Sequence, residues 1–108
     1  MVYAPGMPNR TRAAPIVLAP NPQSPRLSDP ALDVMRRAIA QYLKDGNDPR
    51  VLPSVAASTI LEHEGLYYVV LRAQPGAEPL KVYRLFNDAK RSLKGLNRVP
   101  REVREAAA

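Results

Sequence analysis

The chain has 108 residues and no cysteine, and its 16 basic and 10 acidic side chains give a net charge of +6 at pH 7. The length allows one domain at most. The absence of cysteine excludes disulfides, thiolate zinc sites, iron–sulfur clusters and cysteine nucleophiles. No apolar run approaches the roughly twenty residues that a membrane helix needs, so we expect a cytoplasmic protein without membrane association.

Residues 1–26 contain six prolines and no acidic side chain. Each proline lacks an amide donor and pushes the preceding residue out of helical space. We therefore expect a proline-rich, extended or disordered tail over 1–26 and a small domain over 27–108. One apolar cluster interrupts the tail, formed by Ile16, Val17 and Leu18. It either packs loosely on its own domain or docks on a partner, for example by adding a strand to a sheet edge.

An amphipathic helix of about fifteen residues is the clearest element that the pattern predicts. Ser28 or Asp29 can cap it, Pro30 suits its first turn, and Gly46 suits the position after its end. The apolar residues at helical spacing are Leu32, Met35, Ile39, Tyr42 and Leu43. Because the opposite face mixes Asp33 with arginines, we expect this stripe to pack on a core rather than lie on a membrane.

The second half of the chain changes to the alternating pattern of strands. We expect strands over 59–64, 66–73 and 80–86, with a turn at Gly65 and a loop around Gly76. After Phe86 the pattern fits either a turn with a short edge strand through Leu93 and Leu96, which we expect, or a short basic helix. A final helix over 100–108 follows. The predicted fold is α+β: one amphipathic helix on a small antiparallel sheet of three or four strands, a short C-terminal helix and an extended N-terminal tail.

Alternation along the predicted strands suggests one sheet face that the helix leaves open. If Val69 and Leu71 point to the helix, the opposite face gathers two tyrosines and two cations, namely Tyr68, Tyr83, Arg72 and Lys81. Aromatic rings interleaved with cations are typical of a platform for single-stranded nucleic acid. The alternative is that the tyrosines cover the sheet and the cations only solubilise it.

The last 29 residues hold eight basic and three acidic side chains, a net charge of +5. The cations beyond the third strand are Lys90, Arg91, Lys94, Arg98, Arg101 and Arg104. Such a density favours contacts with phosphates, which give affinity without sequence specificity. An acidic protein surface and simple solubility are the alternatives, and the pattern does not separate DNA from RNA.

The tripeptide Glu62-His63-Glu64 resembles a metal-binding sequence, but neighbouring strand residues point to opposite faces, so we predict no metal site there. No phosphate-binding glycine loop or Ser/His/Asp arrangement accompanies it. We therefore expect a small, non-enzymatic, basic nucleic-acid-binding protein without a cofactor. The alternative is an interaction or assembly component, an adaptor or inhibitor, whose tail docks on a larger partner. The pattern does not predict the oligomeric state.

Overall fold

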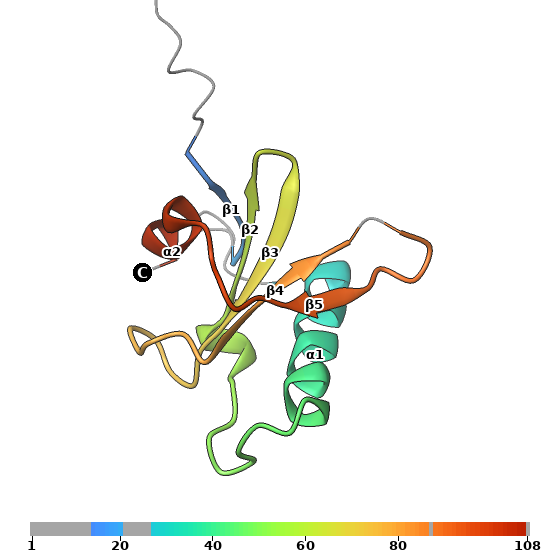
Figure 1. Ribbon diagram of the computed structural model, residues 1–108, viewed down its shortest axis with the longest axis vertical. Helices are drawn as coiled ribbons and strands as arrows, with labels where there is room; N and C mark the ends of the chain where they lie inside the picture. The colour runs from blue at the N-terminus through green and yellow to red at the C-terminus, as the bar shows by residue number, and fades with distance from the viewer. Residues whose placement is uncertain (1–13, 21–26, 87, 108) are drawn as a thin grey trace, which may run out of the picture.

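The computed structural model of the protein describes residues 14–20, 27–86 and 88–107. Within these ranges one antiparallel sheet of five strands forms the centre, and the strands lie side by side in chain order (Figure 1). The strands are β1 (Ile16–Ala19), β2 (Thr59–His63), β3 (Leu66–Leu71), β4 (Lys81–Leu85) and β5 (Leu93–Gly95). The predicted α+β class is confirmed, although the sheet has five strands rather than three or four.

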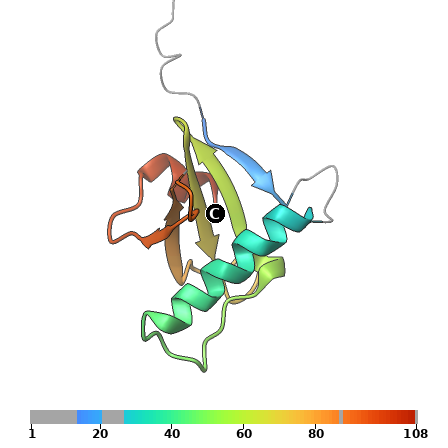
Figure 2. The same ribbon diagram turned by 90° about the vertical axis from the view of Figure 1, so that its right-hand side faces the viewer.

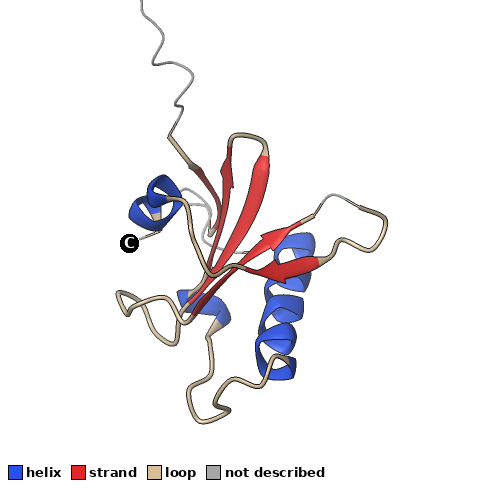
Figure 3. Ribbon diagram, viewed as in Figure 1, coloured by secondary structure: helices blue, strands red, loops and turns tan. Residues whose placement is uncertain are grey.

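Two helices lie on opposite sides of this sheet. The long helix α1 (Asp29–Lys44) crosses one face, and the short helix α2 (Arg101–Ala106) lies behind the other (Figures 2 and 3). A 3₁₀ turn over Val55–Ala57 precedes β2. In the described part of the chain, no helix combines the length and the apolar composition needed to cross a membrane.

The start of α1 follows the predicted capping chemistry. The Ser28 hydroxyl oxygen accepts a hydrogen bond of 3.3 Å from the backbone N–H of Ala31, and Pro30 occupies the first turn. The side chains that α1 buries are Val34, Met35, Ala38 and Tyr42. The contact face is therefore rotated from the expected stripe, since Leu43 is 41% exposed. The fully buried Ala38 marks the centre of this face, because its small side chain lets the helix approach the sheet.

The fifth strand comes from the proline-rich segment. In β1, Val17 pairs with Leu61 and Ala19 with Ile60, with a bulge between the two pairs. Ala19 is 4% exposed in the core beneath α1. The segment Ile16–Ala19 is thus part of the folded sheet and not of an extended tail. Residues 1–13 and 21–26 of the expected tail lie outside the described residues.

Tight connections set the register of the hairpins. Glu64 and Gly65 have φ values of 52° and 79°, and they join the paired residues His63 and Leu66 in the predicted turn. The edge strand expected after Phe86 is β5, which pairs with β4. Between them the carboxylate of Asp88 accepts hydrogen bonds of 3.0 Å from both the backbone N–H and the hydroxyl of Ser92.

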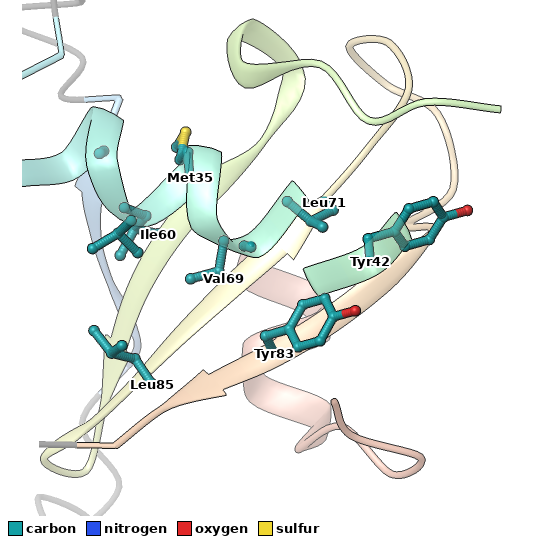
Figure 4. Close-up of a cluster of buried hydrophobic side chains, with 10 residues drawn as sticks. Met35, Tyr42, Ile60, Val69, Leu71, Tyr83 and Leu85 are labelled. Carbon is teal, nitrogen blue, oxygen red and sulfur yellow. The ribbon is translucent and has the colours of Figure 1, made fainter. Parts of the chain in front are cut away.

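Both faces of the sheet are buried. Figure 4 shows the cluster beneath α1, which includes Met35, Tyr42, Ile60, Val69, Leu71, Tyr83 and Leu85. The second cluster lies on the opposite face and contains Leu61, Tyr68, Val70, Val82, Val103 and Ala107. The C-terminal segment therefore covers the face that the sequence pattern leaves open.

Candidate functional site

The two tyrosines of the expected stacking platform lie on opposite faces of the sheet. Tyr83 pairs with Val69 across β3 and β4, so it shares the α1 face, where it is fully buried. Tyr68 lies on the other face and is 4% exposed, packed in the cluster that contains Val103. The prediction of a common open face was wrong, and neither ring is available to stack on a base.

Tyr83 instead holds β4 against the end of α1. Its hydroxyl donates a hydrogen bond of 2.8 Å to Asp45 Oδ2, while Gln41 Nε2 donates one of 2.7 Å to Asp45 Oδ1. These two hydrogen bonds, the first more than the second, lower the pKa of Asp45. Burial and the hydrogen bond to Asp45 raise the pKa of Tyr83. The arrangement is a structural contact between two elements.

The two cations of the expected platform do not lie on an open face either. Arg72 is 5% exposed, and its guanidinium donates hydrogen bonds to two carbonyls, from Nε to Ala77 at 3.0 Å and from Nη2 to Ala107. Lys81 pairs with Leu71 and so belongs to the α1 face. Its side chain passes over Gly95, where an added Cβ would come within 2.7 Å of Lys81 Cε. The two cations therefore do not form the expected platform with Tyr68 and Tyr83.

Two cations, of which the sequence analysis singled out only Lys94, lie opposite each other on β4 and β5. Arg84 and Lys94 are direct cross-strand partners, so both side chains leave the same face of the sheet. The Arg84 guanidinium carbon lies 4.6 Å from the centre of the Phe86 ring. Arg84 Nε is buried without a hydrogen-bond partner, and neither cation forms an ion pair with any described residue.

Further cations gather at the loop between β4 and β5. Arg37 of α1 donates from Nη2 to the carbonyls of Lys90 and Arg91, at 3.1 and 2.6 Å. These hydrogen bonds place the positive charge of Arg37 beside the exposed cations Lys90 and Arg91. The one carboxylate in this loop, Asp88, has a lowered pKa because it accepts hydrogen bonds from Ser92. Its charge only partly offsets the three cations.

The remaining predicted cations, Arg98, Arg101 and Arg104, are exposed along the C-terminal segment. Arg101 is partly neutralised by a 3.1 Å ion pair with Glu105. Figure 1 shows the β4–β5 loop and α2 at opposite sides of the view, joined by β5 and the chain after it. The structure thus brings Lys90, Arg91 and Lys94 to one hairpin and spreads the others along a path away from it.

The apolar segment Ile16–Leu18 packs on its own domain, which is one of the two expected alternatives. Val17 is half-buried in the second cluster. Ile16 and Leu18 remain 57% and 42% exposed at the outer edge of the sheet. Binding of a partner at this edge stays a prediction.

His63 is buried at the end of β2, and its Nδ1 has no hydrogen-bond partner. Glu64 Oε1 lies 3.7 Å from His63 Nε2 because Glu64 has left the strand and entered the turn. The expected alternation therefore fails at this residue. Even so, no three His, Cys, Asp or Glu side chains of the described ranges are placed to hold a metal ion.

The pairing of Arg84 with Lys94 depends on the length of the β4–β5 loop, which the sequence pattern does not fix. The signal that was available is the high density of cations in the last 29 residues. Comparison with known proteins does not extend this description, because the chain matches no protein-family model, no curated protein and no solved structure.

Proposed function

We propose that the protein is a non-enzymatic nucleic-acid-binding protein that contacts phosphates at the β4–β5 hairpin. The observation that carries this proposal is the cross-strand pair of Arg84 and Lys94. Two like charges placed directly opposite each other in a sheet destabilise it, and here no carboxylate among the described residues forms an ion pair with either cation.

A phosphate group between these side chains would relieve the repulsion and accept hydrogen bonds from both. Charge-assisted hydrogen bonds of this kind are about twice as strong as neutral ones. The exposed Lys90 and Arg91 extend the positive surface along the same hairpin, and Arg37 fixes the carbonyls of their loop. Successive cations suit successive phosphates, which release counterions when the protein binds.

The buried tyrosines support phosphate contact over base stacking. Without Tyr68 and Tyr83 on the surface, we expect affinity without the stacking gain of about 1–3 kcal/mol per base. Phe86 is half-buried, and one side of its ring is already occupied by Arg84. We therefore propose that binding depends on charge and tolerates most sequences.

The test measures how the affinity for an oligonucleotide depends on salt. Replacing Lys90, Arg91 and Lys94 by glutamine should weaken binding to all sequences alike. The slope of log affinity against log salt should flatten by about 0.7–0.9 for each phosphate that the variant no longer neutralises. Arg50→Gln is the control, because Arg50 lies in the loop after α1 and is already paired with Asp48 at 3.2 Å. This variant should keep the wild-type slope within about 0.5.

Absence of salt-dependent binding to DNA or RNA at about 50 mM salt would refute the proposal. The alternative function is then a protein–protein interaction or assembly component, an adaptor or inhibitor, whose N-terminal segment docks on a larger partner. The observation that favours this alternative is the exposure of Ile16 and Leu18 at the edge strand β1, 57% and 42%.

A further inference from the structure

A cavity of about 570 Å³ lies on the sheet face that carries α2. One wall is the β3–β4 loop with Ala77, and the other is the chain from Leu96 to Arg104, with Val82 of the sheet between them. The volume falls within the range of about 300–1,000 Å³ that is typical of small-molecule sites. Its lining includes none of the proposed phosphate-binding cations Arg84, Lys90, Arg91 and Lys94, so the proposed phosphate contacts do not explain it.

Arg72 gives this cavity its charge. Its guanidinium donates hydrogen bonds to the carbonyl of Ala77, in the β3–β4 loop, and to the carbonyl of Ala107, after α2. The guanidinium therefore lies between this loop and the C-terminal segment. A guanidinium has five N–H donors, and the described residues accept from two of them. Arg72 is only 5% exposed, and no described carboxylate pairs with it.

An arginine in this setting is costly for the free protein. Burying a cation without a carboxylate is unfavourable, and carbonyl oxygens compensate it only in part. Arg104 and Lys81 line the same cavity, and Arg104 is exposed, so the lining carries two further positive charges. The acidic side chain of the lining, Glu78, forms no ion pair with a described residue.

We propose that this cavity binds a small organic anion. Its carboxylate or phosphate group accepts hydrogen bonds from Arg72 and Arg104, and its apolar body packs on Val82, Leu96 and Val99. The planar guanidinium matches either anionic group with two parallel hydrogen bonds. This site goes beyond the proposed binding of nucleic acid, because it selects a ligand with one charged end and one apolar end.

The experiment is a titration of the ¹⁵N-labelled full chain with phenyl phosphate and with benzoate, followed by NMR. Saturable shifts should gather at residues 76–82 and 96–104, and comparison of the two probes shows which anionic group the site prefers. Benzyl alcohol has the same ring without a charge, and it should bind at least about tenfold more weakly. Saturation of the alcohol at the same concentration as the anions would overturn the proposal.

Variants separate the cavity from general attraction to a basic protein. Arg104→Gln should weaken binding of the preferred anion about tenfold without unfolding the domain, because Arg104 is exposed. Arg36→Gln removes an equal charge from the exposed side of α1, across the sheet, and should change the affinity less than about twofold. Arg72→Lys keeps the charge but loses the planar fork, and it should also weaken binding. Equal effects of Arg104→Gln and Arg36→Gln, or shifts centred on residues 88–94, would overturn the proposal.

Discussion

The Tyr83 hydroxyl donates a 2.8 Å hydrogen bond to Asp45, and this contact has a consequence for stability at low pH. The hydrogen bonds from Tyr83 and then Gln41 lower the pKa of Asp45 from its ordinary value of 3.8. Because the folded pKa is the lower one, the unfolded chain takes up the proton first as pH falls. The stabilisation is therefore complete above the ordinary pKa and is lost as pH falls through the folded pKa.

Tyr83→Phe removes the largest cause of that shift while keeping the ring in the core. We expect the pKa of Asp45 to return toward 3.8 in the folded protein. The fall in melting temperature between about pH 6 and about pH 3 should then be smaller than in the wild-type protein. Thermal unfolding monitored by circular dichroism at several pH values measures this difference. NMR titration of the Asp45 carboxyl measures the pKa directly.

Tyr67→Phe is the matched control, since Tyr67 packs against the same core and makes no hydrogen bond through its hydroxyl within the described ranges. This variant should keep the wild-type dependence on pH. A Tyr83→Phe protein whose melting temperature falls as steeply with acid as the wild type would show that the contact with Asp45 does not contribute. Asp48 and Asp88 also have lowered pKa values, so part of the acid sensitivity should persist in both variants.

At the scale of elements, α1 is held by the residues that face the sheet rather than by its whole apolar stripe. Met35 is fully buried, whereas Leu43 is 41% exposed near the end of the helix. Met35→Ala should lower the free energy of unfolding by about 2–5 kcal/mol, because it leaves a cavity in the core. Leu43→Ala should cost less than about 1 kcal/mol. Urea unfolding of the two variants compares them, and equal costs would contradict the observed orientation of the helix.

Apart from β1, which was expected to be part of the tail, the existence and order of the elements followed from local signals, but their faces did not. Capping by Ser28 and the turn at Gly65 are local, and both were predicted correctly. The strand β3 is apolar on both faces because α1 and the C-terminal segment both cover it. The alternation of apolar residues in β3 therefore could not predict which face of the sheet is exposed. The pairing of Tyr83 with Val69 depends on the loop that joins β3 to β4.

On the scale of the whole molecule, the basic C-terminal segment completes the core and also carries exposed charge. Val99, Val103 and Ala107 cover the second face of the sheet, while Arg98 and Arg104 stay exposed. The sequence shows the excess of positive charge but not which cations meet, because Arg84 and Lys94 become neighbours only through strand pairing. Likewise, the buried guanidinium of Arg72 donates a hydrogen bond to the carbonyl of Ala107, which is 35 positions away in the sequence. Such long-range contacts cannot be derived from local patterns.

The last prediction concerns the contribution of β1 to stability. The sequence predicts a tail that does not contribute to the fold, whereas the structure places β1 in the sheet. Composition alone suggests that removal of 1–26 leaves the melting temperature unchanged. The truncation in fact removes the strand that pairs with β2 and takes Ala19 out of the core. A destabilisation of 1 kcal/mol shifts the melting temperature of so small a domain by about 4–8 °C, and we expect a fall of at least this size.

Two substitutions in the full chain test the same contribution without a truncation. Ala19→Asp places a charge at a position that is 4% exposed, so it should destabilise the protein about as much as removal of the strand. Ile16→Ser is the control on the same strand, because Ile16 is 57% exposed, and it should change the stability by no more than about 0.5 kcal/mol. If the truncated chain melts within about 3 °C of the full chain and Ala19→Asp is as stable as Ile16→Ser, β1 contributes nothing to the fold. The strand could then leave β2, and this would expose the edge of β2 that β1 covers. A partner would be expected to bind at that edge.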